Sequence, residues 1–211
     1  MTAQTFSYKN LFFKMRGHLL RECPVSTVEI TQCIKSFFLT TYQASYNVLC
    51  SHSEGCEFIT DVLVTTFNPK NIITKKTLQL TCNRLNVFLA AESELGGVGA
   101  SSAYGVMKNV VEDYLKLLVT LCEYRVMVFT SLPYSNEENH IVNRVETLRK
   151  LYSMHSSLSG GVLLIHLSGD QPRSTQVQAR ATAEAISGFV ISSDGNSVSQ
   201  LSIPEGESPT E

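Results

Sequence analysis

Apolar and polar residues follow one another along the chain in blocks that predict several strands and several helices. Residues 26–49 have apolar positions at helical spacing, and Ser26 and Glu29 have the S-x-x-E spacing of a capping box. Residues 11–15, "LFFKM", form a short apolar run, and residues 58–67, "FITDVLVTTF", are rich in β-branched side chains. We expect strands at both of these runs and a long helix between them.

The second half of the chain alternates strands with helices. Strands are expected at residues 125–130, 162–168 and 189–192, each with a mostly apolar sequence. Such alternation is typical of a parallel sheet with helices on both faces. The pattern therefore predicts an α/β fold with a doubly wound, mostly parallel sheet, arranged in three layers. Helices are expected at residues 77–92, 106–122, 136–152 and 175–186.

The chain is expected to fold as one domain followed by a polar tail. Its 211 residues suit one domain, and its 43% of hydrophobic residues suffice for a substantial core. Residues 1–193 contain all of the expected strands and helices, whereas residues 194–211 are polar with few apolar side chains. We therefore predict a single α/β domain over 1–193 and a disordered tail over 194–211.

Charge and cysteine content limit the class of function and the compartment. The formal net charge of −2 gives no broad positive field for nucleic acid or for an anionic membrane. No apolar run approaches the roughly 20 residues that span a bilayer, and the N-terminus lacks the pattern of a signal peptide. We expect a cytoplasmic or nuclear protein whose six cysteines are free thiols. Cys50 and Cys56, with His52 between them, form only half of a zinc site, so a metal-free loop is expected there.

The carboxyl ends of parallel strands are where folds of this class bind their ligands. Only one acid, Asp170, is expected there, so catalysis by a pair of carboxylates is not indicated. Ser101 and His18 could act as nucleophile and base, but "GASSAYG" is not the G-x-S-x-G pattern, and "GGVGASS" lacks the lysine of a phosphate-binding loop. His166 lies inside an apolar strand and is expected to be a core residue. No catalytic set is predicted, and the candidate binding residues are Arg16, His18, Ser101, Ser102, Thr130, Ser131 and Asp170.

The order of the segments resembles the von Willebrand factor A domain family over roughly residues 8–193. The likeness is carried by a Gly-Gly loop with small hydroxyl residues at 96–102 and by strands that end in "VTTFN", "VFTS" and "IHLSGD". Many members of that family bind Mg²⁺ at three loops. On this chain those loops would fall near residues 16–20, at Ser101 or Ser102, and at Ser131 or Leu132.

These three loops hold no carboxylate, and the first contains the cation Arg16. Hard divalent cations need carboxylate oxygens, so the resemblance implies a degenerate site that binds no metal. Degenerate members of the family resemble structural subunits of intracellular assemblies, in which the domain is a docking block. No cofactor is expected.

Two functions of different classes are compatible with these residues. The first is a non-enzymatic protein–protein interaction module, a structural subunit of an intracellular, nuclear multiprotein complex. Its partners are then other protein subunits, and neither a membrane nor sequence-specific nucleic acid is expected. The alternative is an enzyme or a binder of small anionic ligands that uses Arg16, His18, Ser101 and Thr130. In that alternative Arg16 holds the anion and His18 is the acid or base.

Two points are left open at this stage. The strands are fewest in the first half of the chain, and an error there would make the protein a mixed α+β structural protein, for instance a viral or cytoskeletal component. The residues of a partner surface are also not fixed by the pattern, because each candidate could equally be core. The candidates are Phe12, Phe13, Tyr42, Tyr46, Tyr134 and Tyr152.

Overall fold

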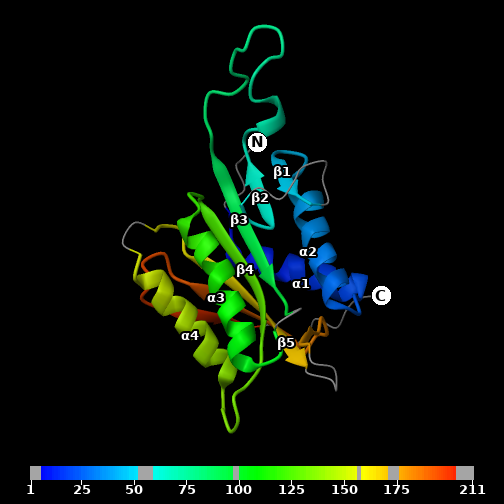
Figure 1. The fold of residues 1–211 in the computed structure, drawn as a ribbon, viewed down its shortest axis with the longest axis vertical. Coiled ribbons are helices and arrows are strands. Elements are labelled where there is room, and N and C mark those ends of the chain that lie inside the picture. Colours follow the sequence, from blue (N-terminus) through cyan, green and yellow to red (C-terminus); the bar gives the residue numbers. More distant parts are fainter. Residues whose placement is uncertain (1–5, 52–58, 97–99, 156–157, 171–175, 203–211) are drawn as a thin grey trace.

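A computed structural model describes residues 6–51, 59–96, 100–155, 158–170 and 176–202. A mixed sheet with helices on both faces forms its centre (Figure 1). The helices are α1 (Tyr8–Glu22), α2 (Thr27–Tyr42), the short 3₁₀ helix η1 (Pro69–Asn71), α3 (Ala103–Val119) and α4 (His140–Ser153). The strands are β1 (Asn47–Cys50), β2 (Val62–Thr65), β3 (Val87–Glu94), β4 (Tyr124–Ser131), β5 (Val162–Asp170), β6 (Gln178–Ala179), β7 (Ile186–Ile191) and β8 (Val198–Leu201).

The sheet has the order β1-β2-β3-β4-β5-β7-β8, and β6 pairs with the end of β5. The α/β class is therefore confirmed, but the sheet is mixed rather than mostly parallel. Only β3, β4 and β5 run parallel to one another, joined by α3 and α4. The pairs on either side, β1–β2, β2–β3, β5–β7 and β7–β8, are antiparallel.

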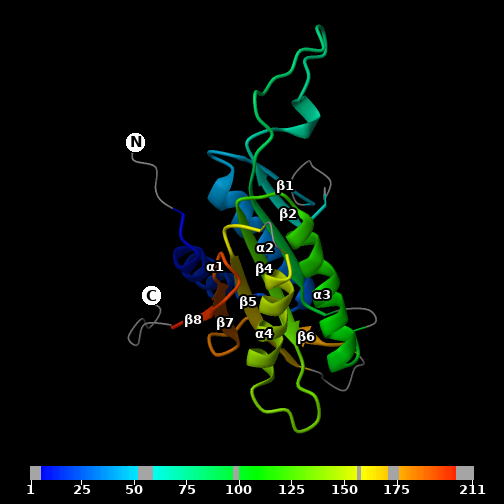
Figure 2. The ribbon, with the colours of Figure 1, turned by 90° about the vertical axis from the view of Figure 1, so that its left-hand side faces the viewer.

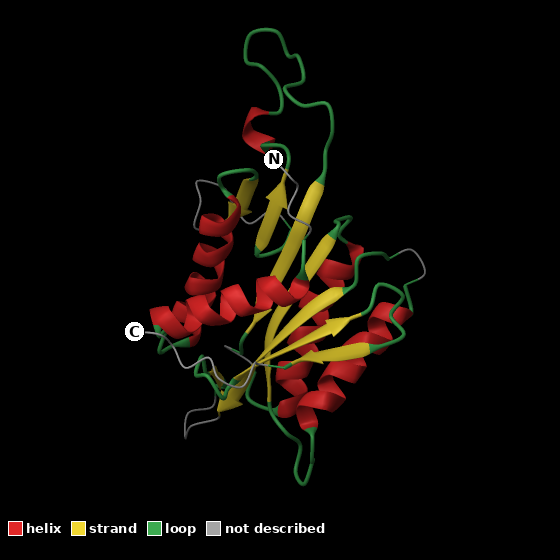
Figure 3. Ribbon diagram, turned by 180° about the vertical axis from the view of Figure 1, so that it is seen from behind, coloured by secondary structure: helices red, strands yellow, loops and turns green. Residues whose placement is uncertain are grey.

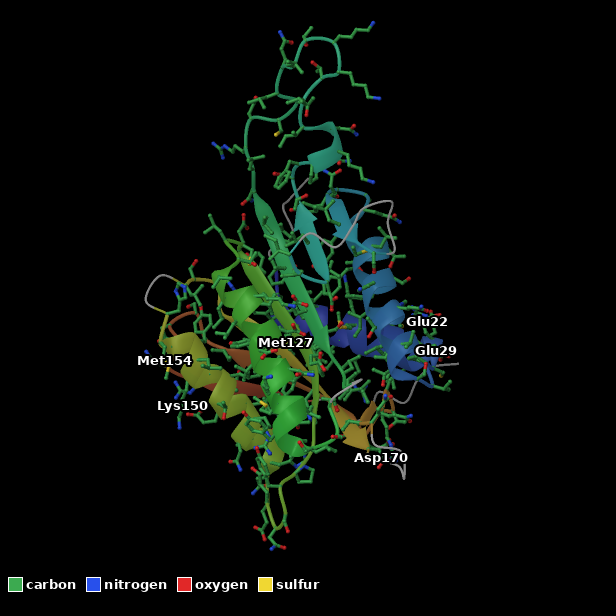
Figure 4. All side chains as sticks on the ribbon, viewed as in Figure 1. Glu22, Glu29, Met127, Lys150, Met154 and Asp170 are labelled. Atoms are coloured by element: carbon green, nitrogen blue, oxygen red, sulfur yellow. The ribbon has the colours of Figure 1, made fainter. Side chains whose placement is uncertain are left out.

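The helices divide between the two faces of the sheet (Figure 2). Side chains alternate along β4, so Val126 and Val128 pack in the cluster under α1 and α2. Met127, labelled in Figure 4, packs with Phe129 in the cluster under α3 and α4. Seven of the eight residues of β4 are buried, as expected for a central strand covered on both sides. None of the described helices is long and apolar enough to cross a membrane.

The first half of the chain departs most from expectation. Residues 11–15 are not a strand but part of α1, which Ser7 caps by accepting a hydrogen bond from the backbone N–H of Asn10. Buried residues on successive turns of α1 are spaced three or four apart, over more than two turns of the helix. Residues 11–15 are too few to show this spacing, so the short apolar run was interpreted as a strand. The buried residues of α1 are Leu11, Phe12, Met15 and Leu19.

Two predicted helices are also wrong. In residues 77–92, the last six residues belong to β3, where Leu89 and Ala91 face one layer and Ala90 faces the other. In the described part of residues 175–186, β6 and a turn lead into β7, and Ile186 pairs with Leu167. Pairing with neighbouring strands outweighs the helix propensity of these leucine- and alanine-rich stretches.

The remaining predictions of elements hold, with shifted ends. Helices α2, α3 and α4 and strands β2, β4, β5 and β7 all lie where they were expected. The polar tail predicted from residue 194 contains β8, which pairs with β7 from Val198 to Leu201. The last nine residues of that tail, and the positions of His52 and Cys56, lie outside the described residues. The other five cysteines are free thiols.

A long connection between β2 and β3 projects from one end of the molecule (Figures 1 and 3). We call residues 66–86 the arm. Thr66 at its base donates a backbone hydrogen bond to Asn86, and further out an isolated bridge joins Ile73 to Leu80. Strands β3, β4 and β5 all begin at the end of the sheet from which the arm extends, so the arm lies opposite their carboxyl ends.

A buried arginine holds the amino ends of the parallel strands. Arg125 is 2% exposed and donates to three backbone carbonyls, those of Leu117, Thr120 and Ser159, each at 3.0 Å. Two of these carbonyls lie at the C-terminus of α3, where the helix dipole favours a positive charge. The Tyr8 hydroxyl accepts the Arg125 backbone N–H at 3.1 Å and donates to the Gly161 carbonyl at 3.0 Å.

Replacing Arg125 with methionine should lower the free energy of unfolding by about 3 kcal/mol or more, because three carbonyls lose their donor inside the protein. Urea denaturation followed by circular dichroism measures this loss. The matched control is Arg84→Met in the exposed arm, which should change stability by no more than about 0.5 kcal/mol. Equal stability of the two variants would show that Arg125 does not hold the fold together.

Candidate functional site

The carboxyl ends of β3, β4 and β5 meet at one edge of the sheet, and five of the seven predicted site residues lie there or at the start of α3. Thr130 and Ser131 end β4, and Asp170 ends β5 at the edge opposite the arm (Figure 4). Ser102 is the N-cap of α3, and its hydroxyl accepts the Gly105 backbone N–H at 3.0 Å. Ser101 precedes it and is exposed.

The other two predicted residues, Arg16 and His18, lie on α1. Arg16 donates through Nη2 to the Ala183 carbonyl at 3.1 Å. His18 is hydrogen-bonded to Arg21 at 3.0 Å. His18 lines a hollow of about 640 Å³ between α1 and α2, but Ser101 and Thr130 are not among its lining residues. The four residues of the proposed ligand site are therefore not gathered around this hollow.

The end of β4 is filled by a buried serine–histidine pair. The hydroxyl of Ser131 and Nε2 of His166 are 2.9 Å apart, and the two residues are 2% and 0% exposed. Burial lowers the pKa of His166 to about 3, with a further contribution from His140, so the imidazole stays neutral. Nδ1 of His166 has no hydrogen-bond partner among the described residues, so nothing there orients the ring as a base. The expectation of a core histidine is confirmed, and the pair is closed to substrate.

Thr130, which precedes Ser131 and points to the other face of β4, is also enclosed by protein. Thr130 is fully buried, and a Cβ atom placed on Gly169 would lie 2.7 Å from its Oγ1. The backbone of Gly169 therefore packs closely on Thr130, and a side chain at position 169 would displace it. Asp170 pairs with Arg180, but both side chains are about half exposed, so the pair adds little to stability.

The loop after β4 is closed by an arginine–carboxylate clamp. Arg144 is 6% exposed and donates through two nitrogens to Glu137, at 2.9 Å and 2.6 Å, and also to the Leu132 carbonyl. The hydrogen bonds from Arg144 lower the pKa of Glu137 to about 2, together with that from the Tyr134 backbone. This is the loop in which the resemblance would place a metal-binding aspartate, and here a protein cation holds it.

Sequence reasoning missed a network of charged residues around the end of β3. Lys35 of α2 is 6% exposed and contacts Asp61 at 3.4 Å, and Asp61 accepts the backbone N–H and hydroxyl of Ser93 at 2.9 Å and 2.6 Å. Asp61 also donates its backbone N–H to Glu92 at 3.4 Å. On the far face Glu92 lies 3.9 Å from Lys116 of α3.

Glu92 is the most perturbed acid of this network. It is 4% exposed, and burial, followed by the nearby Asp61 and Asp113, raises its pKa to about 8. The carboxyl group is therefore neutral at physiological pH, and its Oε1 has no hydrogen-bond partner among the described residues. Lys116 is bound instead to Asp113 at 2.6 Å. The alternation of inward and outward side chains along β3 would have indicated that Glu92 is buried. A helix was predicted over residues 77–92, so this alternation was not considered.

These polar groups do not assemble into a metal site. Among the described residues, no three His, Cys, Asp or Glu side chains are grouped so that they could hold an ion. The negative charge of Asp61 is balanced by Lys35, and that of Asp113 by Lys116, so neither carboxylate needs a metal ion. The network instead joins α2 to β3 through Asp61, the residue before β2, by one ion pair and three hydrogen bonds.

Comparisons with models of protein families, with curated proteins and with solved structures find no match to this chain. The resemblance to the von Willebrand factor A family thus stays a prediction that rests on the residues alone. Its first metal loop, at residues 16–20, lies within α1 rather than after a strand. Its other two loops lie at the start of α3 and at the end of β4.

The pKa of Glu92 makes stability depend on pH. Its folded pKa of about 8 lies above its usual 4.5, so the stabilisation is complete below about pH 4.5 and is lost as the pH rises to about 8. The free energy of unfolding should fall by up to about 1.4 kcal/mol per pH unit across this range. Glu92→Gln should remove this slope in urea melts, whereas Glu112→Gln on the exposed side of α3 should keep it. Identical slopes in both variants would refute the assignment.

The depressed pKa of His166 predicts the opposite slope at acid pH. The stabilisation is present above the usual pKa of 6.5 and is lost as the pH falls towards about 3, because only the unfolded chain takes up the proton. NMR titration of the ring should show His166 neutral at pH 5, below the usual pKa of 6.5. His166→Gln should flatten this acid limb. A ring that titrates near 6.5 would contradict the buried pair.

Proposed function

We propose that this protein is a non-enzymatic protein–protein interaction module, a structural subunit of an intracellular multiprotein complex. It docks through the end of the molecule that carries the arm. The observation that carries this proposal is the number of large aliphatic side chains left in solvent there.

The arm exposes Ile73, Leu78, Leu80 and Leu85, with exposed fractions of 48% to 73%. Val119 and Leu121, where α3 leads into β4, are 73% and 92% exposed. We call these six residues the docking end.

The two parts of the docking end are joined at their base. Asn86, at the base of the arm next to β3, donates from its side chain to Glu123 at 2.6 Å. The Glu123 backbone N–H donates to the Val87 carbonyl at 3.1 Å. The connection after α3 and the base of the arm are therefore neighbours, at the same end of the molecule (Figure 1). A partner that covers one part is well placed to touch the other.

Covering these side chains supplies the free energy of association. Each large aliphatic side chain that is fully buried on binding contributes roughly 1.5–3 kcal/mol. The association of two proteins costs roughly 4–15 kcal/mol. The summed contribution of the six side chains is larger than the lower bound of that cost. Several large apolar side chains exposed at one end of a molecule are a feature of interaction sites. The half-exposed Tyr134 lies elsewhere, after β4, and Phe12 and Tyr152 of the predicted partner surface are buried.

An enzymatic role has less support. At the carboxyl edge, which is where this class of fold does its chemistry, Ser131 is paired with His166, Arg144 with Glu137 and Lys35 with Asp61. Their hydrogen bonds hold neighbouring elements together. The six aliphatic side chains of the docking end are exposed at the other edge.

Replacing Leu78, Leu80 and Leu85 with serine should abolish capture of the partner. The test is native affinity purification of the tagged full-length protein, with stoichiometry measured by mass spectrometry. The wild type should bring down a partner near one-to-one, and the triple variant should lose it, because the apolar contact is gone. The matched control replaces three exposed apolar residues elsewhere, Val25, Val28 and Met154, with serine and should keep the partner.

Both variants should fold as the wild type does, as judged by circular dichroism and thermal melting. Recovery of the wild type alone and monodisperse, or full retention of the partner by the arm variant, would overturn the proposal.

A further inference from the structure

The arm carries a charge opposite to that of the rest of the chain. Residues 66–86 contain four cations, Lys70, Lys75, Lys76 and Arg84, and no acid. The arm is therefore +4 while the whole chain is −2, so the remaining residues together carry −6. No described carboxylate lies within ion-pair distance of Lys75, Lys76 or Arg84, and each of these is exposed. The charge of these three side chains is thus available to a partner.

A lipid surface fits the arm poorly. Besides its aliphatic residues, the arm holds nine threonine, asparagine and glutamine residues, whose polar groups would have to leave water. Among the described residues, four backbone hydrogen bonds join its two limbs, at Thr66–Asn86, Thr74–Gln79, Leu78–Thr74 and Thr81–Ile72. In hydrocarbon every backbone N–H and C=O needs a partner, and this irregular segment supplies few of its own.

Nucleic acid accounts for the cations but not for the leucines. Single-stranded nucleic acid is gripped by aromatic rings that stack on the bases, and the one ring of the arm, Phe67, is partly buried at its base. Leu78 and Leu80, both 73% exposed, gain little against phosphate and sugar. A polypeptide provides backbone donors and acceptors, aliphatic side chains and carboxylates together.

We infer that the arm binds an acidic polypeptide segment in which aliphatic residues alternate with glutamate or aspartate. This inference rests on the proposed function and names the chemistry of its partner. The aliphatic side chains of the segment pack on Ile73, Leu78 and Leu80, and its carboxylates meet Lys75, Lys76 and Arg84 around them. Complementary charge of this kind speeds encounter and excludes basic partners.

The experiment uses the full-length protein and a short synthetic peptide of alternating glutamate and leucine. Binding is measured by fluorescence anisotropy at about 0.05 M and about 0.5 M ionic strength, and the higher salt should weaken it through screening. The variant Lys75→Glu, Lys76→Glu, Arg84→Glu should bind this peptide about tenfold more weakly or worse, because three exposed ion pairs are lost. The same variant should gain binding to a peptide of alternating lysine and leucine, a reversal that a damaged arm would not produce.

Other occupants are outcomes of the same assay. Equal or stronger binding to phosphatidylserine vesicles or to a DNA duplex would overturn the inference, as would arm-dependent self-association without peptide binding. Failure of the inference is distinguishable from failure of the proposed function. If the leucine variant loses the captured partner but the charge-reversal variant keeps it, docking through this end is supported and the inference of an acidic partner is wrong. If neither variant loses the partner, the docking end itself is wrong.

Discussion

The fold depends on one buried cation that carries no carboxylate partner among its described contacts. Arg125 enters the interior because the C-terminus of α3 supplies carbonyls with partial negative charge, and a third carbonyl comes from the segment before β5. This arrangement fixes where α3 ends, where β4 begins and how β5 approaches it. Tyr8 adds α1 from the opposite layer through the backbone of the same residue. The amino ends of β4 and β5 are thereby tied to α3 on one face of the sheet and to α1 on the other.

The two ends of the parallel strands differ in what they leave exposed. At the carboxyl edge, Ser131 meets His166, Arg144 meets Glu137, and Lys35 meets Asp61. These pairs satisfy polar groups that a ligand-binding fold would present to solvent. At the amino edge Arg125 satisfies three backbone carbonyls, and the arm beyond it exposes both aliphatic side chains and cations. Folds of this class usually place their chemistry at the carboxyl ends of the strands, whereas the surface that we propose for contact lies at the other end.

Sequence reasoning found the elements whose signals are local. The run from α3 to β5 was predicted because each segment is long, periodic or apolar throughout, and β4 needs no partner to be recognised. Residues 77–92 failed because their leucines fit a helix as well as an arm followed by a strand. Pairing of Val87 with Thr65 and of Leu89 with Tyr124 decides the matter, and neither is readable from the segment itself. With that error the exposed leucines of the arm were assigned to a helix face.

The sequence predicts the burial of single residues of the candidate site, but not the contacts between them. The expectation that His166 is a core residue needed only its apolar neighbours. Its contact with Ser131, by contrast, requires the register that sets Phe129 beside His166, and the network of Lys35, Asp61 and Glu92 joins three segments distant along the chain.

The position of the arm within the chain has a consequence for how the protein can change over time. The arm is an insertion between two antiparallel strands, β2 and β3, that already pair with each other. The entropy of closing such a loop grows only with the logarithm of its length, about 0.6 kcal/mol for each doubling. The arm can therefore lengthen, shorten or exchange its residues at almost no cost to the sheet beneath it. If the arm is the recognition element, as proposed, recognition and folding are encoded in separable parts of the chain, and new binding preferences could arise without a new fold.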